Sequence, residues 1–142
     1  MTIPGDISVV VGLGCSTAAS ASEIVGLIEA CLAEAGIQPR QIAAFATHIR
    51  KHDSLALKQA AAQFDLPLLV LDDAELAPAI PGTCEAVAAA AGPLLLGKRK
   101  TRHATCAIAV AGPDFDLASF GQPANPSAAI ASSTLATSLA GP

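Results

Sequence analysis

The chain has 142 residues, a formal net charge of −4 at pH 7 and hydrophobic residues at 52% of its positions. This length allows one domain with a core of its own. Tryptophan and tyrosine are absent, which argues against modules that stack nucleic-acid bases on aromatic side chains. No apolar run is long enough to predict a membrane span, and the first residues lack the pattern of a secretory signal. We therefore expect a cytoplasmic protein whose partners include neither nucleic acid nor a membrane.

The cysteines and histidines give no convincing metal-binding pattern. The cysteines are Cys15, Cys31, Cys84 and Cys106. None of them forms a C-x-x-C pair, so a zinc site is poorly supported. Cys31 and Cys106 fall in apolar patterns and are predicted to be core thiols. His48 and His52 have a spacing that suits one helical face, but they span a predicted strand-to-helix junction. We therefore expect neither a metal site nor a cofactor.

Alternating strand and helix patterns predict one α/β domain over residues 7–111. The β-branched run at Ile7–Val11 predicts a buried first strand. Ser20 and Glu23 form a capping box, and apolar residues at helical spacing continue to Gly36, which suits a left-handed helix stop. Further strands are expected at 42–49 and 67–71, and further helices from 53 or 54 to 65 and over 83–91.

The last two predicted strands, Leu94–Leu96 and Thr105–Val110, are joined by a basic turn over residues 97–103. A connection this short makes them an antiparallel hairpin. The earlier strands alternate with helices and are expected to be parallel, so the fold class is a single three-layer α/β domain with a mixed sheet. Residues 112–142 are rich in alanine, serine and proline and are predicted to form a flexible tail.

Two glycines and a cysteine follow the first predicted strand, at Gly12, Gly14 and Cys15. A strand, a glycine turn and a helix N-terminus together make a common anion site. The third glycine and the downstream acid of a dinucleotide-binding fingerprint are missing. An ordinary strand-to-helix turn is the alternative interpretation.

Six of the eight basic residues fall in two places. Arg50 and Lys51 follow the second predicted strand, and the other four are Lys98, Arg99, Lys100 and Arg102 in the hairpin turn. Ligands of open α/β sheets bind beyond the carboxyl ends of the parallel strands. If the hairpin turn reaches that edge, the segments form a basic cleft suited to a small ligand with several carboxylates. The alternative is a solvated turn that protects a sheet edge.

Three side chains are candidates for catalysis. Cys15 lies before a helix N-terminus, where a thiolate nucleophile is stabilised, although a small residue in a tight turn explains it equally well. His48 lies beside the basic segment and can donate or accept a proton. Glu85 opens a predicted helix and can serve as a general base or as an acceptor for Lys98.

Several short motifs occur together in a recognisable order. They are Gly12–Cys15, Ala33–Gly36, Ala46–Lys51, Leu66–Leu68, Ala74–Leu76, Cys84–Ala88 and the hairpin Leu94–Ala109. In order and spacing they resemble the CobE/CbiG C-terminal domain family of cobalamin biosynthesis, over about Ile7 to Val110. Two features depart from the family. The connection Ala77–Thr83 is short, and Thr83-Cys84-Glu85 replaces the usual V-x-E helix start.

The resemblance implies a role in making the corrin ring of vitamin B12 by the aerobic route. It implies a precorrin or corrin intermediate as ligand and other cobalamin-pathway enzymes as partners. The expected ligand-binding residues are Gly12, Gly14, Thr47, Lys51, Lys98, Lys100 and Thr105.

Two other functions stay open. CbiG-like proteins are associated with opening a ring lactone of a precorrin and releasing acetaldehyde, and this hydrolysis would use Cys15, His48 and Glu85. A generic phosphate or nucleotide binder that uses the glycine turn is the second alternative.

Overall fold

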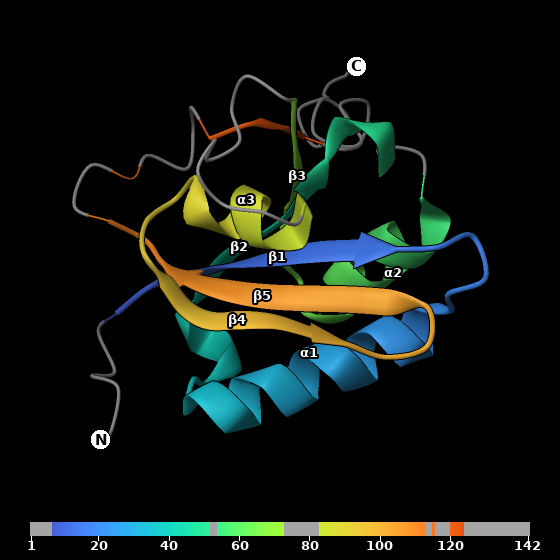
Figure 1. Ribbon diagram of the computed structural model, residues 1–142, viewed down its shortest axis with the longest axis horizontal. Helices are drawn as coiled ribbons and strands as arrows, with labels where there is room; N and C mark the ends of the chain where they lie inside the picture. Colours follow the sequence, from blue (N-terminus) through green and yellow to red (C-terminus); the bar gives the residue numbers. More distant parts are fainter. Residues whose placement is uncertain (1–6, 52–53, 73–82, 113–114, 116–119, 124–142) are drawn as a thin grey trace, which may run out of the picture.

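The computed structural model describes residues 7–51, 54–72, 83–112, 115 and 120–123 (Figure 1). The strands are β1 Val9–Cys15, β2 Ile42–His48, β3 Leu68–Leu71, β4 Leu94–Lys100, β5 Ala104–Val110 and β6 Gln122–Pro123. The helices are α1 Ala21–Ala35, α2 Leu55–Gln63 and α3 Thr83–Ala89, with single 3-10 turns η1 at Pro39–Gln41 and η2 at Ile49–Lys51.

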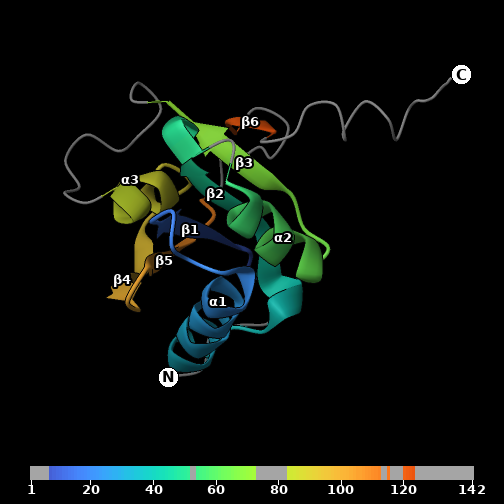
Figure 2. The same ribbon diagram turned by 90° about the vertical axis from the view of Figure 1, so that its right-hand side faces the viewer.

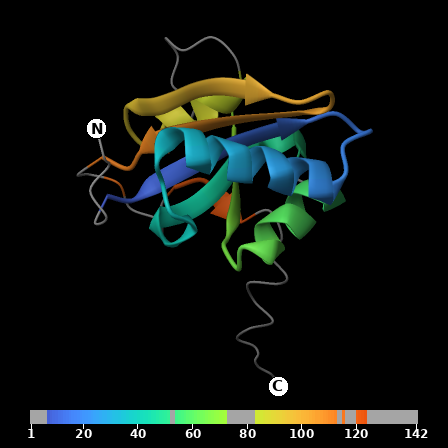
Figure 3. The same ribbon diagram turned by 90° about the horizontal axis from the view of Figure 1, so that it is seen from below.

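All six strands form one mixed sheet in the order β4-β5-β1-β2-β3-β6. β1, β2 and β3 are parallel, whereas β5 is antiparallel to β1, β4 to β5 and β6 to β3. Helices α1 and α2 cover one face of the sheet and α3 covers the other (Figures 2 and 3). The prediction of a three-layer α/β domain with a mixed sheet and a final hairpin is confirmed.

β1 is the strand on which both helix layers pack. Val9 and Val11 belong to the core formed with α1 and α2, whereas Val10 packs with Val87 of α3. All three valines of β1 are 0% exposed, and burying a valine side chain stabilises a fold by about 1.5–3 kcal/mol. The β-branched run therefore supplies the centre of the molecule, because it is apolar on both faces.

Helix α1 has the limits that its sequence predicts. The Glu23 N–H donates to the Ser20 hydroxyl at 3.1 Å, so Ser20 is the N-cap. Gly36 ends the helix with φ of 72°, a left-handed conformation that favours glycine. Cys31 of this helix is buried, as is Cys106 of β5, which confirms the prediction of two core thiols.

The predicted glycine turn is wrong, because Gly12 and Gly14 both lie inside β1. The strand pairs with β5 as far as Cys15, which is opposite Ala104. A Cβ atom on Gly12 would lie 2.2 Å from the Cys84 carbonyl oxygen, and one on Gly14 would lie 2.7 Å from the Thr105 hydroxyl. The glycines therefore allow α3 and the hairpin to approach the strand closely.

The basic hairpin segment is also placed differently from the prediction. β4 continues to Lys100, so Lys98 and Arg99 lie in a strand, and the turn itself is limited to residues 101–103. The Thr101 N–H donates to the Ala104 carbonyl at 2.9 Å and closes the hairpin. Lysines suit this position, because β4 is at the edge of the sheet.

Part of the segment beyond residue 111 packs on the α3 face. Phe115 and Phe120 make an edge-to-face contact, with ring centroids 5.1 Å apart, against the cluster that contains Val10 and Val87. β6 then pairs with β3. Residues 124–142 lie outside the described residues, so the flexible tail remains a prediction for them. The short connection at 77–82 also lies outside the described residues.

Two carboxylates of α1 hold the β4–β5 hairpin. Glu23 accepts hydrogen bonds from the His103 N–H at 2.8 Å and from the Thr101 hydroxyl. Glu34 forms an ion pair with Arg99, with an N–O distance of 2.6 Å. These hydrogen bonds lower the pKa of both carboxyl groups.

The close approach of α3 to β1 predicts that Gly12→Ala destabilises the protein. The added methyl group meets backbone at Cys84, which cannot rotate away, so we expect a loss of about 2–3 kcal/mol in the free energy of unfolding. Gly26→Ala is the matched control, because its Cβ meets nothing within 4 Å in α1, and it should stabilise by about 0.5–1 kcal/mol. Urea denaturation measures both changes, and equal stabilities for the two variants would contradict the packing.

The carboxylate contacts predict a stability that falls in acid. The pKa of Glu23 is lower in the folded protein than its ordinary value of 4.5. The contacts of the ionised carboxylate therefore stabilise the fold fully above pH 4.5, and this stabilisation is lost as the pH falls through the lower pKa of the folded state. Glu23→Gln should therefore be less stable than the wild type near neutral pH and should lose less stability on acidification. Glu29→Gln is the control, since Glu29 is an exposed carboxylate of the same helix. Denaturation midpoints at several pH values would show the two profiles, and identical profiles for Glu23→Gln and the wild type would count against the contact.

Candidate functional site

A cavity of about 640 Å³ opens at the carboxyl ends of β1 and β2. The hairpin turn between β4 and β5 reaches the same edge, since Ala104 pairs with Cys15 at the end of β1. The helices that follow β1 and β2 cover one face of the sheet, whereas α3, which lies between β3 and β4 in the chain, covers the opposite face. β1 therefore lies at the topological switch point of the sheet. Open α/β sheets bind ligands at this position.

The lining of this cavity is strongly basic. It includes Lys51, Lys98, Lys100 and Arg102 together with His48 and His103, and we call it the basic cavity. Among the described residues, no carboxylate lies in its lining or within ion-pair distance of the lysines and Arg102. A chain with a net charge of −4 therefore concentrates positive charge at one edge of its sheet, an arrangement that attracts a small anion.

Most of the expected ligand-binding residues lie around this cavity. Its lining contains Gly14, Thr47, Lys51, Lys98, Lys100 and Thr105. Thr47 is fully buried and donates its hydroxyl proton to the Leu13 carbonyl at 2.7 Å, so it ties β2 to β1 beneath the cavity. Gly12 is not in the lining and lies beneath α3 instead.

The three expected catalytic residues lie near the cavity without forming a connected group. Cys15 places its sulfur 3.5 Å from the Ser54 hydroxyl. Glu85 accepts the Lys98 backbone N–H at 2.8 Å, which fixes β4 against α3. His48 is 8% exposed and lines the cavity at the end of β2. In the described part of the chain, neither Cys15 nor Glu85 is hydrogen-bonded to His48.

Cys84 is a lining residue that the sequence did not assign to the site. Burial raises the pKa of its thiol, although a hydrogen bond with Thr105 acts in the opposite direction. A thiol held neutral in this way is a poor nucleophile. Its position in the helix-start motif was visible in the sequence, but its orientation toward β5 depends on how α3 packs.

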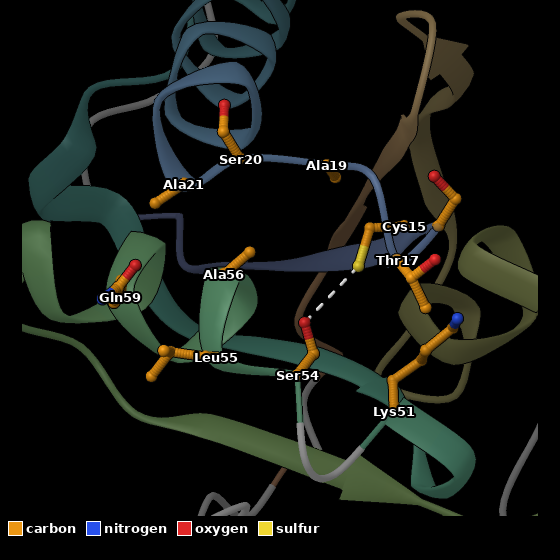
Figure 4. Close-up of a pocket in the computed structure, with 11 residues that line it drawn as sticks. Cys15, Thr17, Ala19, Ser20, Ala21, Lys51, Ser54, Leu55, Ala56 and Gln59 are labelled. Carbon is orange, nitrogen blue, oxygen red and sulfur yellow. Dashed lines mark hydrogen bonds between the residues drawn. The ribbon is translucent and has the colours of Figure 1, made fainter.

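A second cavity of about 580 Å³ lies on the other side of the loop that follows β1 (Figure 4). Ala19, Ala56 and Leu55 give it an apolar wall, and the N-terminal ends of α1 and α2 border it. Cys15, Ser16 and Lys51 line both cavities. No sequence motif indicates this cavity, since it depends on how α1 and α2 pack against each other.

The described residues limit two other possibilities. No group of three or more His, Cys, Asp or Glu side chains among them is arranged to hold a metal ion. None of the described helices has both the length and the apolar character needed to span a membrane.

Comparison with known proteins supports the interpretation of these motifs. The family model described as "Cobalamin synthesis G C-terminus" matches residues 9–109. Comparison with curated protein sequences gives no significant match.

Three solved structures share the fold. The crystal structure of CobE, a protein from the cobalamin (vitamin B12) biosynthetic pathway, is 27% identical with a TM-score of 0.67, over 78% of this chain and 94% of that chain. The cobalamin biosynthesis protein chiG from Agrobacterium tumefaciens str. C58 is 24% identical with a TM-score of 0.63, over 75% and 99% of the two chains. A cobalamin biosynthesis protein G homolog from Sulfolobus solfataricus is 21% identical with a TM-score of 0.60, over 75% of this chain and 37% of that one.

The last two similarities, at such identities, concern the fold alone. The family model covers well over half of the chain and its match ends within β5, so it includes the parallel strands β1, β2 and β3 and nearly all of the hairpin. The chain belongs to the cobalamin synthesis G C-terminus family.

Proposed function

We propose that this protein binds a polycarboxylate ring intermediate of cobalamin biosynthesis, a precorrin or a corrin, in the basic cavity. The observation that supports this most directly is the gathering of Lys51, Lys98, Lys100 and Arg102 around one cavity, with no carboxylate partner among the described residues. Carboxylates accept charge-assisted hydrogen bonds from ammonium and guanidinium groups. The ligand would supply the negative charge that the described lining of the cavity lacks.

The size and position of the cavity agree with this proposal. Its volume of about 640 Å³ lies within the range of about 300–1,000 Å³ that is usual for small-molecule sites. The cations come from two directions, Lys51 from the end of β2 and Lys98 and Lys100 from β4. Such an arrangement suits a ring with several carboxylate side chains better than a ligand with one charge.

The route, the partners and the location belong to the same proposal. Similarity to CobE at 27% identity supports a role in the cobalamin biosynthetic pathway. We propose that this role belongs to the aerobic route, with other cobalamin-pathway enzymes supplying and receiving the ligand. The four cysteines are free thiols, which suits the reducing conditions of the cytoplasm.

Lactone hydrolysis is the second candidate function. Cys15, His48 and Glu85 remain candidates for it, and a hydroxyl–imidazole contact at the mouth of the basic cavity favours acyl chemistry there. The described residues do not favour a nucleotide binder that uses a glycine turn, because Gly12 and Gly14 lie within β1 rather than in a phosphate-binding turn.

The proposal predicts that loss of a cavity lysine weakens ligand binding. We expect Lys98→Ala and Lys51→Ala each to raise the dissociation constant of a metal-free corrin with free carboxylates about 5- to 10-fold, or about 1–1.4 kcal/mol. Lys58→Ala is the matched control, since Lys58 carries the same charge in α2 outside both cavities. Its dissociation constant should stay within about twofold of the wild-type value. Absorbance or fluorescence titration of the full chain measures all three.

Salt and ligand charge provide an independent check on the same binding. Affinity should fall as ionic strength rises, because exposed charges are screened, and the amidated form of the ring should bind much more weakly. If the cavity variants and the control bound equally well, or if amidation had no effect, the basic cavity would not be the binding site.

A further inference from the structure

A serine and a histidine meet at the mouth of the basic cavity. The Ser16 hydroxyl oxygen lies 3.3 Å from Nδ1 of His103, although the two residues are 87 positions apart in the sequence. Both line the basic cavity, Ser16 at the end of β1 and His103 in the hairpin turn. Ser16 is exposed, so a ligand in the cavity can reach its hydroxyl.

The backbone holds this pair in place. The Ser16 N–H donates to the His103 carbonyl at 2.8 Å, and the His103 N–H donates to Glu23 at 2.8 Å. The hairpin turn is therefore fixed to the loop and to α1 at the same time. The Ala18 N–H donates to the Ser16 hydroxyl oxygen at 3.3 Å, a contact that helps to hold this oxygen beside the imidazole.

We propose that Ser16 is an acyl-accepting nucleophile and that His103 is its general base, acting on a carboxylic ester within a polyanionic ligand. A nucleophile within hydrogen-bond reach of a base is the arrangement that acyl transfer requires. The choice of a polyanionic ester rests on the proposed function, because Lys100 and Arg102 line the same cavity beside the pair.

The reaction consumes one water molecule and produces one acid and one alcohol. The Ser16 hydroxyl proton moves to Nδ1 of His103 while the oxygen bonds to the ester carbon. The carbon–alkoxide bond then breaks, and the leaving oxygen takes the proton from His103. Water next attacks the acyl-serine and gives a proton to His103. The bond to Ser16 breaks, and the serine oxygen recovers that proton.

Ser16 fits this role better than Cys15 does. The Cys15 sulfur points toward Ser54 at the α2 N-terminus, in the cavity on the other side of the loop (Figure 4). Among the described residues its thiol has no hydrogen bond to a histidine. Among the contacts of the described residues, the one between Ser16 and His103 therefore joins a nucleophile to a base at this edge of the sheet.

A fluorophosphonate probe tests the pair without requiring the natural ligand. In the full-length protein we expect the serine oxygen to displace fluoride and form a bond to phosphorus, so that peptide mass analysis finds Ser16 modified. Ser16→Ala should abolish this modification, and His103→Ala should slow it at least 100-fold. Added imidazole should restore part of the rate in His103→Ala, which a purely structural histidine would not allow. Ser22→Ala, an exposed serine of α1, is the control and should react like the wild type.

The outcomes separate this inference from the proposed binding function. If Ser16 stayed unmodified, or reacted as fast in His103→Ala without imidazole, the pair would not be catalytic, whatever the corrin affinity. Circular dichroism and urea denaturation of each variant establish that it is folded. Should His103→Ala not fold, His103→Gln serves in its place, with the same expected loss of rate. A wild type that reacted at Ser16 but bound no corrin would leave the pair intact and refute the proposed ligand.

Discussion

The close packing of α3 against β1 is the constraint on which the rest of the structure depends. Gly12 lets the Cys84 carbonyl lie where any side chain would have to be. Gly14, two residues further on the same side of the strand, leaves space for the Thr105 hydroxyl of β5. Because neither residue has a side chain, α3 and the hairpin both approach the end of β1, and Gly14 contributes only backbone to the lining of the basic cavity.

The electrostatic character of the cavity follows from that geometry. β4 and the hairpin turn bring Lys98, Lys100 and Arg102 to the edge where β2 delivers Lys51. Like charges at one site repel each other and oppose folding, so this arrangement costs stability unless a ligand neutralises it. Arg99 belongs to the same strand but is paired with Glu34 of α1. Arg99 therefore holds the hairpin against α1 and is not part of the cavity lining. Lys98, Lys100 and Arg102 are the cations of this segment that are available to a ligand.

Local sequence patterns predicted the elements whose limits depend on near neighbours. The N-cap at Ser20, the left-handed Gly36 and the antiparallel hairpin all follow from residues close in sequence. The glycine turn was mispredicted, because whether Gly12 and Gly14 lie in a strand or a turn depends on α3 and β5, which come some 70–90 residues later. For the same reason the sequence could suggest a basic edge but could not place Ser16 beside His103, a contact between residues 87 positions apart.

The central claim is that the basic cavity at the end of β1 receives the carboxylates of a corrin-type ring, and a nuclear magnetic resonance titration tests it most directly. The full-length, isotope-labelled chain would be titrated with a metal-free corrin that carries free carboxylates, and then with its amidated form. The account predicts that backbone shifts concentrate at Gly14, Thr47, Thr105 and the end of β4 around Lys98, and that the amidated ring produces much smaller shifts. Shifts that centre on another face of the protein, or that are the same for both rings, would contradict it.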